Sequence, residues 1–575
     1  MEATKSRLAL TDYLVSLIHN TPSTIIDKVV YLIQGKLRPD YEGIELGIAE
    51  KMIIRALSRA LSVDISSIEE AYRQTGDLGD AARKIISSKE NKITTRFTVE
   101  HIYSTLEVIA RTSGAGSQEL KVNYIVELLN HSTSREARYI IKFIMGLRLG
   151  IADYTVMDAL AISFTGNKSN RKILEDAYNV CSDLGTVAKV VATKGIEAVK
   201  TIQITLFKPI RPMLAERVRT APEALSRMEG GVAAAEYKLD GERIQVHLGK
   251  ELYDGDNNIR DGDNSSSKVE LFSRRLENIT HQYPDVINAI VSSLKKVAKE
   301  AIFESEVVAI DPQTLELRPF QELMHRRRKH EIDKTIAQYP VRLNIFDVLY
   351  LDGDDKTSLP YNQRRKILER ILQQVAIKTS DEVKINKNKH NSSDNSNRGI
   401  LDNNYNTSMI QLIPQTLVKS SEEIEKYMSS AIESGCEGLV LKQLSSIYKA
   451  GSRGYLWTKL KREYRSELAD TLDLVIVGAL HGRGRRVGKY GALLLACYDH
   501  EADIFRSISK VGAGFTDIHL EDFYKKLEKH KIEHVHPRVD TKTQNMDVWF
   551  EPSVVIEVIA SEITVSSAYS AAMNS

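Results

Sequence analysis

Three charged residues stand at alternate positions in the stretch "AAAEYKLDGERIQVHL", residues 233–248, which otherwise has the pattern of a half-buried strand. On a strand, residues two apart face the same way, so Glu236, Lys238 and Asp240 project together, and Gly241 then turns the chain. A lysine in this setting is a candidate nucleophile if neighbouring cations lower its pKa. A surface ladder of alternating charge is the alternative, and Lys-x-Asp-Gly alone does not decide between the two.

Other strand-like segments also direct basic and acidic residues toward one side while their flanks stay apolar. They place Trp457, Lys459 and Lys461 in "YLWTKLKREY", Glu304 and Glu306 in "AIFESEVVAID", and Glu437 and Lys442 in "GCEGLVLK". This combination is typical of a site for a phosphorylated ligand and a divalent cation. A P-loop ATPase is disfavoured, because "GRGRRVGKYG" has neither the Walker A spacing nor a Ser or Thr after Lys489.

The composition is that of an ordinary soluble globular protein with several domains. The chain has 575 residues, 42% of them hydrophobic, and a net charge of +2, so a nucleic-acid surface requires local segregation of Lys and Arg. Its three cysteines, Cys181, Cys436 and Cys497, lie too far apart for a CxxC zinc module. Neither a signal peptide nor an apolar run of membrane-spanning length is present, and we expect a cytoplasmic protein.

Three regions follow from the patterns along the chain. Residues 1–205 are predicted to be helical; Leu46, Ala49, Ile53, Leu57 and Leu61, for example, recur at the spacing of one buried helical stripe. Residues 206–466 alternate strand-like and helical runs, with a polar, largely disordered insertion at about 379–408. Residues 467–575 have the short strands and Gly-rich turns of a small β-barrel. The aspartates of 254–267 imitate a calcium loop without its downstream glutamate.

Six motifs in one order resemble the ATP-dependent DNA ligases, closest to the archaeal type. They are "EYKLDGER", "LFSRRLENIT", "ESEVVAID", "VRLNIFDVLYLDG", "GCEGLVLK" and "GSRGYLWTKLK". The likeness extends to "GLRLGIADYTVMDAL" among the N-terminal helices and to "DVWFEPSVVIEVIASEIT" near the end. It implies an all-α DNA-binding domain, an α+β nucleotidyltransferase (adenylation) domain and a C-terminal OB-fold β-barrel.

The resemblance also implies an activity, the sealing of nicks in duplex DNA during replication, repair and recombination, with ATP and Mg²⁺ as cofactors. Lys238 would form a lysyl-AMP intermediate, with Asp240 beside the reacting phosphates. The implied ATP-binding residues are Glu236 and Phe346 at the adenine, Arg243 and Arg274 at the ribose and polar edge, Arg453, Lys459 and Lys461 at the phosphates, and Glu306. The implied metal carboxylates are Glu306 and Glu437. Roles for Glu304, Arg275 and Lys442 stay open, since each fits an ordinary structural position equally well.

The expected partner is nicked double-stranded DNA, bound mainly through phosphates. Candidate contacts are Lys189, the run Arg483, Arg485, Arg486 and Lys489, and the run "HRRRKH" at 325–330; each also fits a solvated charged face. We expect a monomer. A sliding-clamp partner stays open, although "QITLFKPI" at 203–210 only loosely resembles a clamp-binding peptide and is better interpreted as a linker.

The sequence departs from the family where it stops. Family members continue past "EVIASEIT" into a basic motif associated with lysine adenylation, whereas this sequence ends at Ser575, so we expect it to join a pre-adenylated nick better than it charges its own lysine. Two alternatives share some of these features. One is an RNA ligase or capping-type nucleotidyltransferase, and the other is a non-catalytic clamp that binds nicks.

Overall fold

The computed structural model describes residues 1–571 except 3, 5, 88–96, 148, 251–266, 328–331, 390–408, 462–470, 483–485, 487, 544 and 560–567. Residues 1–45 with 148–465 form one compact unit, and residues 46–147 and 466–575 are assigned to a second. The first unit contains the candidate site.

The N-terminal region is all-helical, as predicted. Its α-helices are α1 (Arg7–His19), α2 (Ile26–Ile33), α3 (Glu50–Leu61), α4 (Ile65–Thr75), α5 (Leu78–Ser87), α6 (Val99–Arg111), α7 (Ser117–Asn130), α8 (Ser134–Ile144), α9 (Asp153–Thr165), α10 (Arg171–Cys181), α11 (Leu184–Lys194) and α12 (Ile196–Val199). The predicted stripe is helical only from Glu50 onward. Gly43 and Gly47 before it have positive φ angles, which a right-handed helix does not contain.

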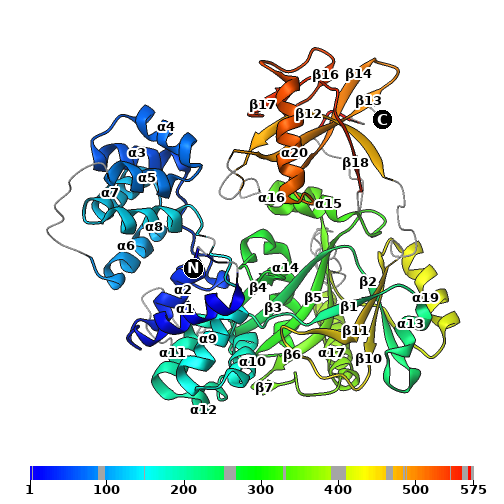
Figure 1. Ribbon diagram of the computed structural model, residues 1–575. Helices are drawn as coiled ribbons and strands as arrows, with labels where there is room; N and C mark the ends of the chain where they lie inside the picture. Colours follow the sequence, from blue (N-terminus) through cyan, green and yellow to red (C-terminus); the bar gives the residue numbers. More distant parts are fainter. Residues whose placement is uncertain are drawn as a thin grey trace. The chain divides into compact units, whose positions relative to one another are not determined.

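The central region is a mixed α/β domain (Figure 1), as predicted. Its strands are β1 (Leu214–Val218), β2 (Ala233–Lys238), β3 (Glu242–Lys250), β4 (Ser267–Ser273), β5 (Ala301–Ala309), β6 (Val341–Leu351), β7 (Asp354–Asp355), β8 (Ile410–Leu412), β9 (Gln415–Val418), β10 (Gly438–Gln443) and β11 (Arg453–Lys461). Its α-helices are α13 (Ala221–Ser226), α14 (Pro284–Ser293), α15 (Phe320–Leu323), α16 (Ile332–Gln338), α17 (Tyr361–Lys389) and α19 (Ser421–Glu433).

These strands form two sheets, with the orders β1-β11-β10-β2-β9 and β4-β3-β5-β6-β7, and β8 pairs with β6. The chain passes from the first sheet to the second between β2 and β3, at the turn that contains Gly241. A Cβ on Gly241 would collide with the carbonyl oxygen of Val307, so this close approach requires glycine. The turn therefore places Lys238 where the two sheets meet.

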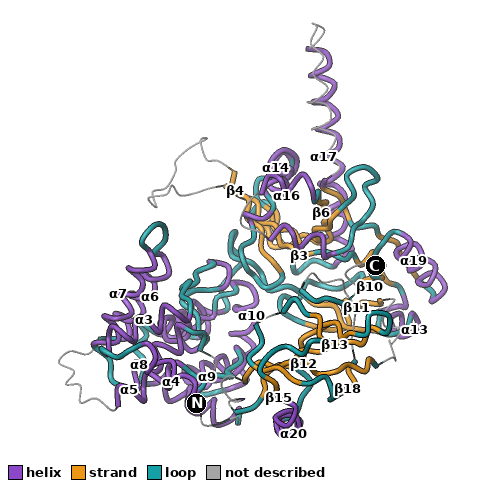
Figure 2. Tube along the Cα trace, turned by 90° about the horizontal axis from the view of Figure 1, so that it is seen from above, coloured by secondary structure: helices purple, strands orange, loops and turns teal. Residues whose placement is uncertain are grey.

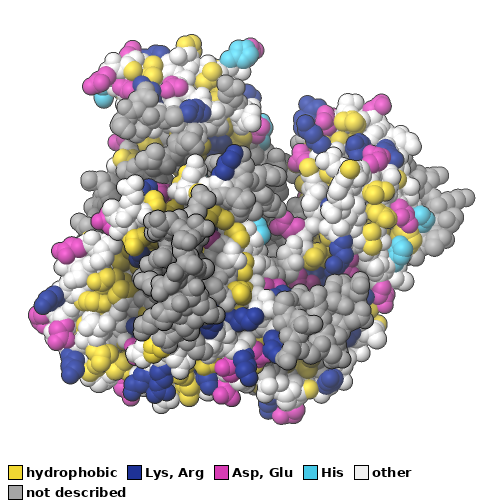
Figure 3. Space-filling model, turned by 180° about the vertical axis from the view of Figure 1, so that it is seen from behind, with side chains coloured by type: hydrophobic (Ala, Val, Ile, Leu, Met, Phe, Trp, Pro, Cys, Tyr) yellow, Lys and Arg dark blue, Asp and Glu magenta, His cyan; other side chains and the backbone are white. Residues whose placement is uncertain are grey.

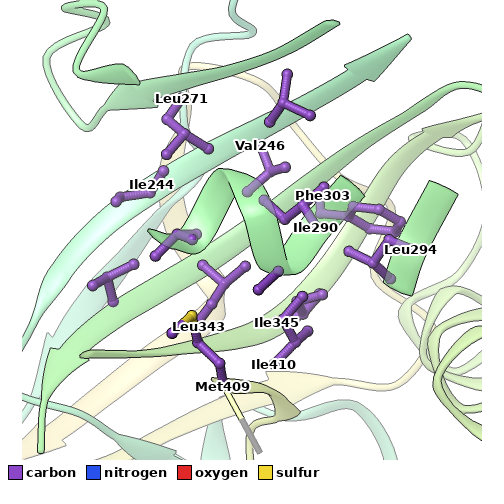
Figure 4. Close-up of a cluster of buried hydrophobic side chains, with 14 of the residues drawn as sticks. Ile244, Val246, Leu271, Ile290, Leu294, Phe303, Leu343, Ile345, Met409 and Ile410 are labelled. Carbon is purple, nitrogen blue, oxygen red and sulfur yellow. The ribbon is translucent and has the colours of Figure 1, made fainter. Parts of the chain in front are cut away.

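The second sheet is held by an apolar core on one of its faces. Ile244 and Val246 of β3 pack with Phe303 of β5, Ile345 of β6 and Ile290 of α14 (Figure 4). Because strand side chains alternate, the intervening residues of β3 face the other way. Those residues are Arg243, Gln245 and His247.

Helix α17 continues into the segment expected to be a polar insertion. Its last turns, up to Lys389, extend away from the sheets (Figure 2), and residues 390–408 lie outside the described residues. No proline or glycine occurs between Tyr361 and Lys389 to end the helix. The aspartate-rich loop at 254–267 lies outside the described residues except for Ser267.

The C-terminal region is strand-rich, with a curled sheet in the order β15-β17-β12-β13-β14-β16 and with β18 paired to β12. Its elements are β12 (Leu472–His481), β13 (Tyr490–Asp499), β14 (Ile504–Val511), α20 (Asp517–Leu527), β15 (Lys531–Ile532), β16 (Val539–Asp540), β17 (Val548–Phe550) and β18 (Val555–Val558). Among the helices of the described ranges, none is long and apolar enough to cross a membrane.

Candidate active site

A pocket of about 420 Å³ lies between the two sheets of the central domain. The first sheet contributes lining residues from β2, β10 and β11, and the second contributes lining residues from β3, β5 and β6. All residues predicted to act in catalysis, ATP binding or metal binding line it: Glu236, Lys238, Asp240, Arg243, Arg274, Glu306, Phe346, Glu437, Arg453, Lys459 and Lys461. The structure thus brings together residues from six segments of the chain.

Lys238 is the last residue of β2, and its ammonium forms an ion pair with Glu437. The backbone explains this contact, because β10 runs antiparallel to β2 and the N–H of Glu437 donates to the carbonyl of Lys238 (2.9 Å). Lys461 of β11 contacts the same carboxylate at 3.1 Å. Burial acts to raise the pKa of Glu437, but the charges and hydrogen bonds of Lys238 and Lys461 hold that pKa below its ordinary value.

The wall formed by β11 is cationic. Trp457, Lys459 and Lys461 alternate along this strand and all line the pocket, as their spacing predicts. Burial, together with the nearby charges of Arg453, Lys238, Arg274 and Lys461, lowers the pKa of Lys459. Several cations that repel one another in a partly buried pocket favour the binding of a polyanion such as a triphosphate.

Two further carboxylates face these cations. Burial raises the pKa of Glu306 to about 7, and no donor among the described residues is hydrogen-bonded to its carboxylate. Burial and the charge of Glu437 raise the pKa of Asp240, whose carboxylate accepts a hydrogen bond from the N–H of Phe320 (3.3 Å). No group of three or more His, Cys, Asp or Glu side chains suitable for a metal occurs within the described part of the chain. Mg²⁺ nevertheless commonly binds one or two protein carboxylates together with phosphate oxygens, and the predicted pair Glu306 and Glu437 offers such carboxylates.

The inner end of the pocket contains a buried ion pair. The Glu236 carboxylate lies 2.6 Å from Lys442 Nζ and also accepts a hydrogen bond from the Tyr361 hydroxyl. The Lys442 ammonium lies 4.7 Å from the centre of the Phe346 ring and 4.4 Å from the centre of the Trp457 ring. Lys442, whose role the sequence leaves open, therefore holds Glu236 in place and contacts the aromatic side chains that line the pocket.

The guanidinium of Arg243 is held by hydrogen bonds to three other protein groups. Its Nε donates to Glu304 (2.7 Å), its Nη1 to the carbonyl of Met213 (2.8 Å), and its Nη2 to the hydroxyl of Tyr448 (3.4 Å). Glu304 is 1% exposed and does not line the pocket, in contrast to Glu306 two residues later. The two glutamates, equivalent in the sequence pattern, have different surroundings.

Of the predicted DNA contacts, several are engaged within the protein. Lys189 bonds the carbonyl of Thr24 and contacts Asp27 at 3.4 Å, and Arg486 donates to the carbonyl of Gly512 (2.8 Å). Lys489 lies 3.5 Å from Glu521. Arg483 and Arg485 lie outside the described residues.

The run at 325–330 contains one residue that is structural. Arg326 is 2% exposed and forms a bidentate ion pair with Asp285 at 2.7 and 2.8 Å. Its side chain is therefore not available to DNA phosphates, and the prediction of a DNA contact is wrong for Arg326. Residues 328–330 lie outside the described ranges.

Sequence reasoning missed Tyr361 and Tyr448. Each hydroxyl bonds a buried glutamate, Glu236 and Glu304 respectively, at a sequence separation of more than a hundred residues. Neither tyrosine lies in a periodic pattern of charged residues. The only signal in the sequence was the glutamates themselves, since a buried carboxylate needs donors from elsewhere in the fold.

Protein-family models and curated relatives both match this chain. Models of the ATP dependent DNA ligase domain, the DNA ligase N terminus and the ATP dependent DNA ligase C terminal region match residues 212–461, 1–161 and 486–572. The DNA ligases of Cenarchaeum symbiosum and Nitrosopumilus maritimus are each 48% identical to this chain over its whole length and 89% of their own. DNA ligase 2 of Thermofilum pendens is 46% identical over 100% of this chain and 89% of its own length.

Together, the nucleotide-sized pocket, its lysine and these matches define a nucleotide-binding ligase. The chain belongs to the ATP-dependent DNA ligases.

Proposed function

We propose that this enzyme seals nicks in duplex DNA in three transfers, using Lys238 as the nucleophile. Lys238 Nζ attacks the α-phosphorus of ATP, so that a P–N bond forms, the α–β phosphoanhydride bond breaks and pyrophosphate leaves. An oxygen of the 5′-phosphate at the nick then attacks the same phosphorus and regenerates the lysine. Finally, the 3′-hydroxyl attacks the activated 5′-phosphate and displaces AMP. The position of Lys238 inside the cationic pocket carries this proposal.

The other pocket residues position the nucleotide and stabilise charge. Arg453, Lys459 and Lys461 hold the triphosphate, and Arg243 and Arg274 hold the ribose and polar edge. Phe346 stacks on the adenine, with Glu236 at the base's edge, and Asp240 lies beside the reacting phosphates. The presence of all these side chains in one pocket supports the roles.

Glu306 and Glu437 would hold a Mg²⁺, since both carboxylates line the pocket and Glu306 has no donor bound to it among the described residues. When bound, such an ion neutralises developing charge on the phosphates. Of the two carboxylates, Glu437 also orients Lys238, which it contacts directly.

The match of residues 1–161 to a DNA ligase N terminus supports nicked DNA, rather than RNA, as the substrate. We propose roles in replication, repair and recombination, a cytoplasmic location beside chromosomal DNA, and action as a monomer. The curled C-terminal sheet supports an OB-fold for residues 467–575. A sliding-clamp partner is proposed on family grounds alone.

Incubation with labelled ATP and Mg²⁺, followed by nicked duplex, tests the proposal. We expect covalent labelling of the wild type, transfer of AMP to the nick and sealing. Lys238→Ala should lose self-labelling by a factor of at least about 10⁴, because it lacks the nucleophile, yet still seal a chemically pre-adenylated nick.

Lys172→Ala is the matched control, since Lys172 is an exposed lysine on α10 that contacts Asp176 (2.7 Å) outside the pocket. It should label like the wild type. A wild type that neither takes up AMP nor seals a pre-adenylated nick would remove the proposed function, and labelling of Lys238→Ala at the wild-type rate would remove Lys238 as the nucleophile.

A further inference from the structure

Residues 207–213 join the helical region to the central domain, and the sequence predicts the first four of them, at the end of 203–210, to be part of a linker. We call residues 207–213 the connector. Two of them, Ile210 and Met213, are 1% exposed. In a flexible linker, the backbone N–H and C=O groups would form hydrogen bonds with water. In the connector, several of these groups instead form hydrogen bonds with side chains of the central domain.

Three side chains from one face of β3 bond the connector at every third residue. His247 Nδ1 accepts from the N–H of Phe207 (2.9 Å). Gln245 bonds both main-chain groups of Ile210, accepting from its N–H (2.7 Å) and donating to its carbonyl (3.0 Å). Arg243 Nη1 donates to the carbonyl of Met213. The alternation that buries Ile244 and Val246 in the core thus directs these three residues onto the connector.

The amide of Gln245 has a partner for each of its four hydrogen-bonding positions. Burial lowers the pKa of His247 to about 3, so its ring is neutral. Because Nδ1 accepts a hydrogen bond, the ring proton lies on Nε2, which donates to Gln245 Oε1 (2.9 Å). Gln245 Nε2 also donates to Glu304 (3.0 Å). A fully satisfied buried amide has one orientation, which fixes the groups around it.

Glu304 joins this network to the nucleotide pocket. Its carboxylate accepts hydrogen bonds from Arg243, Gln245 and Tyr448. The Tyr448 hydroxyl also accepts from the N–H of Met213 (2.9 Å), so the main chain of Met213 is held at both its N–H and its carbonyl. Arg243 is the one member of this network that lines the nucleotide pocket among the described residues.

The other side of the connector is bonded to the helical region. The N–H of Arg211 donates to the carbonyl of Asn179 in α10 (2.9 Å), and Ser182 Oγ donates to the carbonyl of Pro209. The carbonyl of Arg211 accepts from the N–H of Gly451 (2.9 Å), two residues before Arg453. The connector is therefore held between α10, β3 and the segment that leads into β11.

We propose that the connector is a rigid brace, and that Gln245 and Tyr448 act through it and through Glu304 as positioning residues for Arg243 in ATP binding. This inference rests on the proposed function, in which Arg243 holds the ribose. Neither residue lines the nucleotide pocket. Their effect is therefore on the geometry of Arg243 and not on the attack by Lys238.

The test measures self-adenylation by Gln245→Leu and Tyr448→Phe at varied ATP concentration. Tyr448→Phe removes one oxygen and opens no cavity, so it keeps the test valid if Gln245→Leu fails to fold. In both, we expect KM for ATP to rise about tenfold while kcat stays within about twofold, as loss of a buried hydrogen-bonding partner in ground-state binding predicts. At saturating DNA, the rate of sealing a pre-adenylated nick should stay within about twofold of the wild type, because the bound duplex itself brings the AMP group to the pocket.

Gln443→Leu is the matched control. Gln443 lies on β10 and bonds Glu229 (2.9 Å) outside the pocket, so its KM should equal that of the wild type. A purely structural role would lower kcat through loss of active enzyme at unchanged KM, and that result in both variants would overturn the proposal. An inactive wild type would instead remove the proposed function, so the two failures are distinguishable.

Discussion

His247 shows at the residue scale how burial determines the protonation of a side chain. The ring packs edge-on against Phe272 at 4.9 Å between centres and is fully buried, and it bonds Phe207 and Gln245. No charged group pairs with it among those contacts. Burial without a counter-charge disfavours the imidazolium, which is why the pKa of His247 falls to about 3.

The pKa of His247 predicts a pH dependence of stability. Below the ordinary histidine pKa of about 6.5, the unfolded chain binds a proton that the folded ring does not, and this lowers the free energy of unfolding. The stability contributed by the neutral His247 ring is therefore complete above pH 6.5 and is lost as the pH falls toward 3. His247→Gln keeps an acceptor and a donor but does not titrate. As the pH falls below 6.5, the stability difference between wild type and variant should therefore change progressively more steeply, approaching about 1.4 kcal/mol per pH unit near pH 5.

Calorimetric unfolding of both proteins at several pH values measures that difference in the free energy of unfolding. The contributions of the other titrating groups are the same in both proteins and cancel. Parallel stability curves for wild type and variant below pH 6.5 would show that His247 is protonated in the folded protein.

At the scale of elements, the pairing of β10 with β2 and β11 decides where Glu437 lies. Gly438 starts β10 with a φ of +151°, and a Cβ there would collide with the carbonyl oxygen of Leu460 on β11. A residue with a side chain at this position would have to displace one strand from the other. Because Glu437 immediately precedes Gly438, such a displacement would move the carboxylate that contacts Lys238.

Gly438→Ala should therefore destabilise the central domain by roughly 1–3 kcal/mol and slow self-adenylation. Gly454→Ala is the matched control, because Gly454 lies on β11 with open space around its Cα, and it should be within about 0.5 kcal/mol of the wild type. Urea unfolding and labelling rates measure both effects. Equal behaviour of the two variants would mean that the strand pairing tolerates a side chain at Gly438.

At the scale of the whole molecule, the net charge of +2 gives little general attraction for DNA. Basic and acidic side chains are interspersed on the face seen in Figure 3. Binding to a nick therefore has to come from local groups of Lys and Arg that contact phosphates and release counterions.

We predict that the affinity for a nicked duplex falls by about 10³-fold or more between 50 and 200 mM salt, as about six phosphate contacts would require. Fluorescence anisotropy with a labelled nicked duplex measures the slope. A dissociation constant that does not change with salt would show that phosphate contacts do not dominate binding.

Much of the fold and the site could be predicted from local patterns. Alternation of period two in β2 and β11 correctly places Glu236 with Lys238 and Lys459 with Lys461 on the pocket side, because the geometry of a strand is a local property. The ends of helices were predicted less well. The glycines before α3 postpone its start to Glu50, and α17 extends to Lys389.

The tertiary structure alone decided which side chains meet. Glu304 and Glu306 share one face of β5, yet Glu304 bonds Gln245, Tyr448 and Arg243, whereas Glu306 lies in the pocket. The partner of Lys238 is 199 residues away, and the register of β2 against β10 brings it there. Sequence periodicity states which way a side chain points, whereas its partner depends on strand order and register, which are set by packing of the whole domain.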